Sequence, residues 1–326
     1  MFDVDPRRQD LQNAVNIRRL EARGGKLNIR LAKEWPNLIA TGLQVAASEA
    51  LVAKSVKSTA KAEVLPFLKW AGGKRWLMPL AHQLREVPFR SYFEPFLGSG
   101  AMFFALAPKS AVLSDVNIDL IEAYRALREN ACAVERELIK HHRFHDSDYY
   151  YDIRASKPRT PHTRAARFIY LNRTCWNGLY RVNRQGQFNV PKGTKENVLL
   201  DSDNFCEIGK RLESVSLRSG DFEKTIEKAG AGDLIFTDPP YTVRHQYNGF
   251  VKYNEQLFSW DDQVRLKTAL VLAKNRGAKI ICTNADHASI RELYEPDFDL
   301  FPVDRYSAIS GLSTSRGKYA ELIITA

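Results

Sequence analysis

A carboxylate followed at once by two prolines and a tyrosine, Asp238-Pro239-Pro240-Tyr241, has the composition of a site that holds an amino group. Proline has a fixed φ and no backbone N–H, so the Pro240 carbonyl can point outward with no neighbouring donor competing for it. The Asp238 carboxylate and this carbonyl then form a rigid pair of acceptors. Such a pair could bind both N–H groups of a planar base's exocyclic amine and direct its lone pair toward an electrophile, while Tyr241 stacks on the ring.

A short apolar strand must position these residues. Leu234, Ile235 and Phe236 precede Asp238 and are bounded by polar residues and prolines, which predicts a buried strand that ends at the edge of a sheet. Other apolar runs along the chain alternate with helical patterns, which predicts a mostly parallel α/β sheet. The further strands are expected near 92–96, 111–113, 215–219, 279–283 and 320–325, and the helices at 101–107, 118–130, 223–228 and 261–275.

Two glycine-containing segments upstream suit a small ligand. In the stretch 67–74 a pair of glycines lets the backbone approach a ligand closely, with Trp70 as an aromatic wall and Lys74 as a cation. Gly98-Ser-Gly100 forms a turn before a helix, and the next strand ends at Asp115, where an acid could bind ribose hydroxyls. Asp115 could instead cap the following helix. The third glycine of the dinucleotide fingerprint is missing.

A segment crowded with Asn, Arg, Gly and aromatic residues runs from 168 to 191. Residues 183–186 carry a turn signal between two short extended runs, so a hairpin is expected there. Arginine pairs well with guanine and asparagine with adenine, and an aromatic side chain can wedge between bases. The alternative is a polar hairpin with a buried aromatic residue.

These motifs, in this order, resemble those of the Dam-type DNA adenine-N6 methyltransferases. The resemblance rests on Lys-Trp-Ala-Gly-Gly-Lys at 69–74, Phe-x-Gly-x-Gly at 96–100, the run from Leu171 to Pro191 and Asp-Pro-Pro-Tyr at 238–241. It covers roughly residues 66–326. It implies a Rossmann-like methyltransferase sheet in a domain at 64–326, with an inserted helical and β-hairpin DNA-recognition region at approximately 131–200.

The resemblance also implies a role for each matching residue. The catalytic residues would be Asp238, Pro239, Pro240 and Tyr241, and S-adenosylmethionine would be bound by Trp70, Lys74, Phe96, Gly98, Gly100, Asp115, Asp221, Phe222 and Asp238. Asp221 could equally cap the helix that follows it. DNA would be contacted by Trp176, Asn177, Leu179, Arg181, Asn183 and Pro191. Arg181 favours a GATC-like target, but Thr194-Lys195-Glu196 departs from the basic and aromatic pair that the family commonly has there.

The expected reaction is direct methyl transfer from S-adenosylmethionine to N6 of an adenine flipped out of double-stranded DNA, with no metal ion. Three alternatives stay open: N4-cytosine methylation, methylation of adenine in RNA, and a sequence-specific DNA-binding protein that does not catalyse. A cognate restriction nuclease or another defence component is open as a partner. The sequence does not decide the oligomeric state.

Composition agrees with this class of protein. The 326 residues are 44% hydrophobic, enough for a large core, and the formal charge of +10 favours a polyanionic partner. The cysteines at 132, 175, 206 and 282 are too far apart in sequence to indicate a zinc site or a disulfide framework. No apolar stretch is long enough to span a membrane and the N-terminus lacks a signal-peptide pattern, so a soluble cytoplasmic protein is expected.

The N-terminal residues 1–63 have a different character. Helix-compatible spacing at 10–23 and 43–57 is interrupted at Gly24-Gly25, which predicts a helical or flexible extension and linker. Beyond the catalytic strand, an aromatic loop with Tyr247, Phe250, Tyr253 and Phe258 could fold over an extruded base. Residues 307–318 are expected to form a mobile basic loop near DNA. The histidines at 141, 142 and 145 are expected on a solvated helix end.

Overall fold

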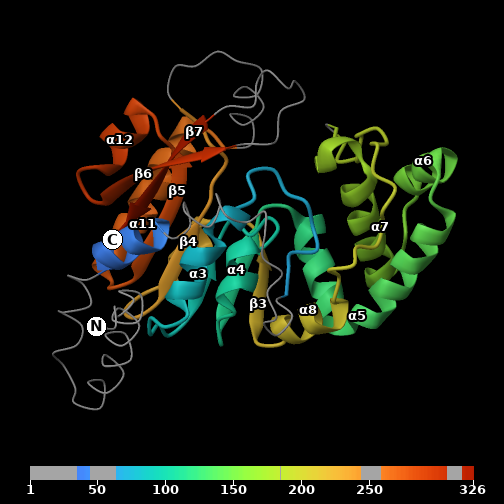
Figure 1. Ribbon diagram of the computed structural model, residues 1–326, viewed down its shortest axis with the longest axis horizontal. Coiled ribbons are helices and arrows are strands. Elements are labelled where there is room, and N and C mark those ends of the chain that lie inside the picture. The colour runs from blue at the N-terminus through green and yellow to red at the C-terminus, as the bar shows by residue number, and fades with distance from the viewer. Residues whose placement is uncertain (1–34, 45–63, 184, 244–257, 307–317) are drawn as a thin grey trace, which may run out of the picture.

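The computed structural model describes residues 35–44, 64–183, 185–243, 258–306 and 318–326, except for the side chains of residues 305, 306, 318 and 319. Its body is a sheet of seven strands with helices on both faces (Figure 1). The strand order is β3-β2-β1-β4-β5-β7-β6, in which β1 to β5 are parallel and β7 runs antiparallel between β5 and β6. This order confirms the predicted Rossmann-like α/β class. The strands are β1 (Tyr92–Glu94), β2 (Ala111–Asp115), β3 (Val215–Ser219), β4 (Leu234–Thr237), β5 (Lys279–Ala285), β6 (Asp299–Tyr306) and β7 (Lys318–Thr325).

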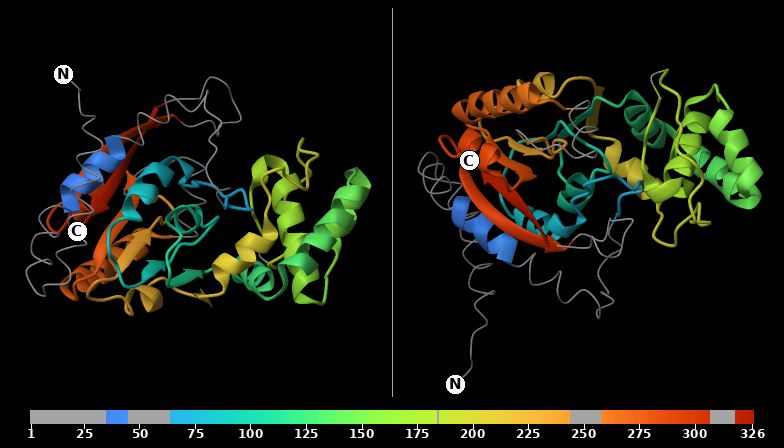
Figure 2. Two further views of the ribbon diagram at one scale, coloured as in Figure 1. Left: turned by 60° about the horizontal axis from the view of Figure 1, so that its bottom comes forward. Right: turned by 90° about the horizontal axis from the view of Figure 1, so that it is seen from above.

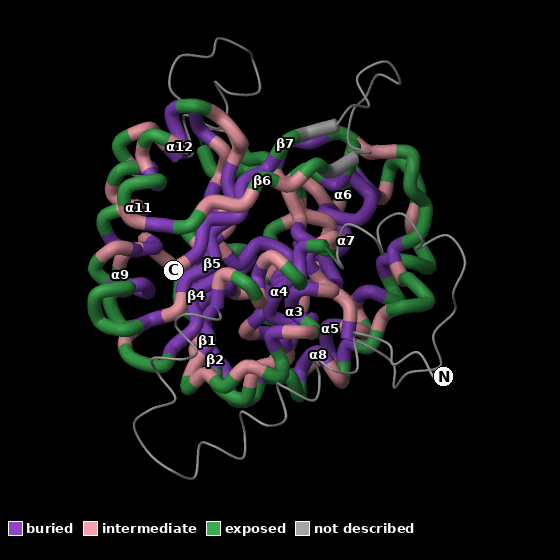
Figure 3. Tube along the Cα trace, turned by 60° about the vertical axis from the view of Figure 1, so that its left-hand side comes forward, coloured by how far each residue is buried: buried purple, intermediate pink, exposed green. Residues whose placement is uncertain are grey.

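Side chains alternate between the two faces of each strand, which divides the core into two clusters. In β4, Leu234 and Phe236 belong to one cluster and Ile235 to the other. The first cluster includes side chains of helix 35–44, α3 (Met78–Leu84) and α4 (Ala101–Leu106), and the second includes side chains of α9 (Glu223–Ile226), α11 (Trp260–Asn275) and α12 (Ala288–Tyr294). The central strands β4 and β5 are therefore buried on both sides (Figure 3).

Helix 35–44 lies within the range expected to be an extension, but it is part of the core. Trp35, Ile39 and Leu43 are buried at a spacing of four residues and join the first cluster together with Leu80 of α3. This helix lies against the strands near the C-terminus (Figure 2). It begins well before the helix expected at 43–57, of which only the first two residues are described. The helix expected at 10–23 and the loops at 244–257 and 307–317 lie outside the described residues.

The chain between β2 and β3 forms the inserted region (Figure 1). Its elements are α5 (Ile118–Phe144), α6 (Ser147–Ala155), α7 (Pro161–Thr174), the short 3-10 helix η3 (Trp176–Gly178) and α8 (Phe205–Leu212). The helix expected at 118–130 continues to residue 144 across a non-helical residue at Asn130. The expected hairpin consists of two isolated bridges, Cys175↔Lys192 and Val182↔Phe188, around a turn in which Gly186 N donates to the Asn183 carbonyl (2.9 Å).

Two residues of α7 tie the insertion to the segment 67–74. The Asn172 side chain accepts from Lys69 N (2.9 Å) and donates to the Lys69 carbonyl (2.7 Å). Arg173, which is 1% exposed, pairs with Asp203 and donates to the Phe67 and Val198 carbonyls. The inserted region is therefore held in place by hydrogen bonds to the backbone of the segment 67–74.

The expectation of a solvated histidine cluster is wrong for two of the three residues. The His141 ring is buried against Tyr170 (centroids 4.9 Å apart) and its Nδ1 lies 2.8 Å from the Tyr149 hydroxyl. His145 Nδ1 lies 2.7 Å from the Tyr170 hydroxyl, and only His142 is exposed. The reason is tertiary: tyrosines of α6 and α7 cover this end of α5. In the described part of the chain, no group of three or more His, Cys, Asp or Glu side chains is placed to hold a metal ion, and no helix is long and apolar enough to cross a membrane.

Acid should destabilise the fold through His141. Burial lowers the pKa of His141 from 6.5 to about 4, so the folded state binds fewer protons than the unfolded state between these two values. Stability contributed by the neutral ring is complete above pH 6.5 and is lost as the pH falls toward 4. At pH 5.5 the expected loss in the free energy of unfolding is about 1 kcal/mol.

Urea unfolding at pH 7.5 and 5.5 measures this loss. His141→Gln should reduce the pH dependence, whereas the same substitution at exposed His142 should leave it unchanged. An equal pH dependence in all three proteins would contradict the assignment.

Candidate active site

Three polar side chains interrupt the apolar pattern at one edge of the sheet. In the first core cluster, Phe236 of β4, Ile281 of β5 and Ile323 of β7 face the same side. Two residues further toward this edge, the side chains on that face are Asp238, Thr283 and Glu321. Because β7 runs antiparallel to β5, its early residues lie beside the carboxyl end of β5, which in turn neighbours β4. The topology therefore gathers residues that are distant in sequence at one site.

Lys74 completes this site from the glycine-containing segment. It is 4% exposed, and its Nζ lies 2.7 Å from Asp238 Oδ1 and 3.9 Å from Glu321 Oε2. Nζ also donates to the Gly72 carbonyl (2.7 Å) and lies 4.9 Å from the centroid of the Tyr241 ring. The predicted cofactor residue Lys74 and the predicted catalytic residue Asp238 thus form one buried ion pair.

The contacts of Asp238 leave one face of its carboxylate open. Thr283 Oγ1 donates to Oδ1 (2.6 Å), the same oxygen that Lys74 contacts. Among the residues that the structure describes, none donates a hydrogen bond to Oδ2 or to the Pro240 carbonyl. Asp238 is 19% exposed at its side chain, whereas Lys74 beside it is almost fully covered. The arrangement supports the expected pair of acceptors facing a ligand.

Tyr241 is held by a residue that the motifs did not indicate. Its hydroxyl donates to Glu321 Oε2 (2.9 Å), and burial raises the pKa of Tyr241 well above 10, which keeps the hydroxyl protonated. Thr283 and Glu321 were both missed from the sequence. In each case the sequence does contain an indication: a polar residue stands two positions from a buried apolar residue of the same strand, on the face that is otherwise apolar.

The glycine turn after β1 brings three further predicted cofactor residues together. Gly98 has φ +48, its N–H donates to Asp115 Oδ2 (3.0 Å), and a Cβ at this position would lie 2.6 Å from Trp70 Cδ1. The alternative role for Asp115 is wrong, because the residue that caps α5 is Asn117, whose side chain accepts from Leu120 N. Asp115 Oδ1 accepts from Asn117 N (3.0 Å), so Asp115 braces the turn between β2 and α5.

Phe222 and Asp221 lie at the end of β3. Phe222 is buried against Phe96 (centroids 5.3 Å apart) and Phe258 (5.8 Å). Asp221 Oδ1 accepts from Glu223 N (2.9 Å), but the N-cap position of α9 is Phe222, so Asp221 is not its cap; Oδ2 pairs with Arg265 (3.0 Å). Both residues are therefore already engaged with protein groups.

The loop after α7 that is predicted to contact DNA (the recognition loop, 176–191) presents apolar side chains to solvent. Trp176 is 50% exposed and Leu179 is 38% exposed. Asn177 between them has φ +55, a left-handed conformation that asparagine tolerates better than most residues and that turns the chain sharply after Trp176. Tyr180 stacks on Trp70 (centroids 6.0 Å apart, 20° between planes), so this loop lies directly beside the segment 67–74.

The polar residues predicted to read DNA divide into two groups. Arg181 is exposed and its Nε donates to Asn189 Oδ1 (3.0 Å). Asn183 instead forms the turn, because its Oδ1 accepts from the backbone N–H groups of Gln185 and Gln187. Pro191 contributes a carbonyl that accepts from Trp176 N (2.9 Å). Of these three residues, Arg181 is the one that carries side-chain donor groups at the exposed surface of the loop.

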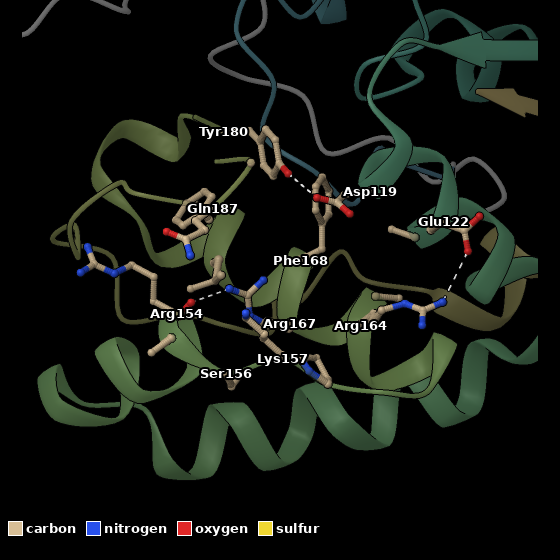
Figure 4. Close-up of a pocket in the computed structure, with 17 residues that line it drawn as sticks. Asp119, Glu122, Arg154, Ser156, Lys157, Arg164, Arg167, Phe168, Tyr180 and Gln187 are labelled. Carbon is tan, nitrogen blue, oxygen red and sulfur yellow. Dashed lines mark hydrogen bonds and ion pairs between the residues drawn. The ribbon is translucent and has the colours of Figure 1, made fainter. Parts of the chain in front are cut away.

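A pocket of about 520 Å³ lies within the insertion rather than at Asp238 (Figure 4). Four cationic side chains from α6, α7 and the loop between them line it, and the Tyr180 hydroxyl donates to Asp119 on the opposite side. The cations are Arg154, Lys157, Arg164 and Arg167. Glu122 partly offsets this charge through a contact with Arg164 at 3.7 Å. Positive charge thus gathers next to the recognition loop.

Comparison with known proteins agrees with this geometry. The D12 class N6 adenine-specific DNA methyltransferases match residues 70–309 of the chain. The chain belongs to this family. It is therefore an N6 adenine-specific DNA methyltransferase of the D12 class, and the part of the chain that matches holds both the ion pair and the recognition loop.

Individual relatives extend over most of the chain. It is similar to the type II methyltransferase M1.LlaDCHI of Lactococcus lactis subsp. cremoris, with 37% identity over 274 residues, 81% of this chain and 96% of the relative. It is also similar to a DNA adenine methylase of Serratia marcescens, with 31% identity over 264 residues, 79% of this chain and 96% of the relative. The DNA N-6-adenine-methyltransferase of Escherichia phage P1 is 37% identical over 277 residues, which cover 81% of this chain but 35% of the phage protein.

Proposed function

We propose that this D12-class enzyme transfers the methyl group of S-adenosylmethionine directly to N6 of an adenine flipped out of double-stranded DNA, in a GATC-like site. The observation that supports this most is the hydrogen bonding of the acceptors beside Lys74. Asp238 Oδ2 and the Pro240 carbonyl accept no hydrogen bond from the described residues, while Oδ1 of the same carboxylate is fixed by two donors. The amino group of adenine has two N–H donors to match the two acceptors.

The residues at the carboxyl edge fit a nucleoside methyl donor. Trp70 lies under Gly98 with no room for a side chain between them, and Asp115 and the exposed apolar residues Val116 and Ile118 follow at the end of β2. An acid next to apolar surface suits a ribose with its base. Trp70, Lys74, Phe96, Gly98, Gly100, Asp115, Asp221 and Phe222 are the residues that we propose to bind it, and S-adenosylmethionine would supply an electrophilic methyl carbon on a sulfonium.

Asp238 would orient the adenine rather than remove its proton, since a carboxylate is too weak a base to deprotonate an aromatic amine. Flipping the base out of the duplex requires a few kcal/mol. Stacking on Tyr241, at about 1–3 kcal/mol per base, and the two hydrogen bonds to N6 would offset that loss. Most of the rate acceleration would then come from positioning.

Radiolabelled methyl transfer to synthetic duplexes tests the function. We expect incorporation into duplexes that contain adenine in the target, none into duplexes in which that adenine is replaced, and little competition from RNA. Incorporation into cytosine or preferential use of RNA would favour one of the two alternative substrates. Sequence-specific DNA binding without any incorporation would make the chain a non-catalytic binding protein. Sequencing of methylated adenines in cells that express the protein would give the target.

Arg181 should read one base pair of that target. We expect Arg181→Ala to lose discrimination at a single position by about 1–3 kcal/mol, because a bidentate contact from arginine to guanine is lost. Methylation rates on duplexes substituted at each position measure this. Arg211→Ala on α8, which removes the same charge from an exposed helix, should leave specificity unchanged. Uniform weakening at all positions in Arg181→Ala would show that Arg181 contacts phosphates instead.

A further inference from the structure

A buried carboxylate on the last strand contacts the candidate active site without having a part in the function proposed above. Glu321 is 2% exposed and lies on β7. Its Oε2 accepts from the Tyr241 hydroxyl (2.9 Å) and lies 3.9 Å from Lys74 Nζ. Glu321 therefore touches both the ring proposed to stack on the base and the cation that pairs with Asp238.

Lys74 lies close to two carboxylates rather than one. One ammonium lies between two carboxylates, and it is held at 2.7 Å from Asp238 and also donates to the Gly72 carbonyl. A carboxylate that fully neutralises a buried ammonium accepts further hydrogen bonds more weakly, because the cation withdraws its negative charge. A second carboxylate near the same ammonium takes up part of its positive charge. Asp238 then keeps more of its own negative charge.

We propose that Glu321 is a positioning residue for methyl transfer. Its negative charge shares the Lys74 ammonium with Asp238, and its carboxylate fixes the Tyr241 ring, so that Asp238 stays an anionic acceptor for the amino group. This inference rests on the proposed role of Asp238 at the same site. The strand topology accounts for its place: Glu321 pairs with Ala285 in register, two residues beyond Thr283, which also orients Asp238.

The substitution Glu321→Gln removes the charge and keeps the size and an oxygen that can accept from the Tyr241 hydroxyl. We expect the single-turnover methylation rate to fall about 10- to 100-fold, since hydrogen bonds to charged groups are the strong ones. The dissociation constant for DNA should change less than about threefold, because Glu321 is not among the residues proposed to contact DNA. Glu321→Asp keeps the charge and should recover part of the rate. Glu292→Gln, the same substitution at an exposed position of α12, should match the wild type.

A double-mutant cycle with Lys74→Met tests whether Glu321 acts through Lys74. In the Lys74→Met background, Glu321→Gln should cause little further loss of rate, because the ammonium that Glu321 shares with Asp238 is already absent. A wild-type rate in Glu321→Gln, or additive losses across the cycle, would overturn the proposal. A loss of rate that follows unfolding in Glu321→Gln and is not recovered by Glu321→Asp would assign a purely structural role. Activity in Asp238→Ala would instead show that the proposed role of Asp238 has failed.

Discussion

Asp238→Ala should abolish methyl transfer, with a loss of at least about 10²- to 10³-fold, the range found when one electrostatic contact to a reacting group is removed. The substitution removes the acceptor proposed for the adenine amino group. It also leaves Lys74 and Thr283 without the oxygen that both now contact. Neither effect reaches the recognition loop, so DNA affinity should persist.

Two measurements separate catalysis from binding in this variant. Single-turnover methylation gives the rate, and fluorescence anisotropy with a labelled duplex gives the dissociation constant for DNA. Asp238→Asn serves as the matched variant: it keeps the size of the side chain but replaces one acceptor oxygen by a donor, and it should be as inactive as Asp238→Ala. Full activity in either variant would refute the assignment of Asp238.

Arg173→Met should produce the largest loss of stability among the residues of the insertion. It leaves the Asp203 carboxylate, 9% exposed, without its cation, and it leaves the Phe67 and Val198 carbonyls without their donor. Removing one partner of a buried ion pair destabilises a protein by about 3–5 kcal/mol. Because Phe67 begins the segment that carries Trp70 and Lys74, methylation should fall as well.

Urea unfolding measures the expected change in the free energy of unfolding. Arg211→Met, an exposed arginine on α8, should lie within about 0.5 kcal/mol of the wild type. Arg173→Met combined with Asp203→Asn should recover part of the stability, because the unpaired negative charge is removed. A loss below about 1 kcal/mol for Arg173→Met would contradict the structural role assigned to this pair.

Local patterns were sufficient to predict six of the seven strands, whereas β6 (Asp299–Tyr306) was missed. β4 is an apolar run followed by Asp238 and two prolines. Neighbouring residues therefore indicate both the strand and the point where it ends. The same holds for α11 and for the glycine turn at Gly98. Helix 35–44 also had a readable signal, since Trp35, Ile39 and Leu43 are spaced by four, but its neighbours suggested an extension.

Contacts between distant strands were beyond sequence reasoning. The Lys74–Asp238 pair joins residues that are far apart in the chain, and Glu321 reaches both only because β7 inserts antiparallel beside β5. The burial of His141 has the same origin, because tyrosines of α6 and α7 cover it. The spacing of residues within one helix or strand cannot indicate which other element will pack against it.

The most direct measurement is a crystal structure of the protein with a target duplex and a non-reactive analogue of S-adenosylmethionine. We predict that the target adenine lies outside the helix on the Tyr241 ring, with N6 at about 3 Å from both Asp238 Oδ2 and the Pro240 carbonyl. An adenine that remains stacked in the duplex, or one bound in the pocket of the insertion while Asp238 contacts only Lys74 and Thr283, would contradict the account.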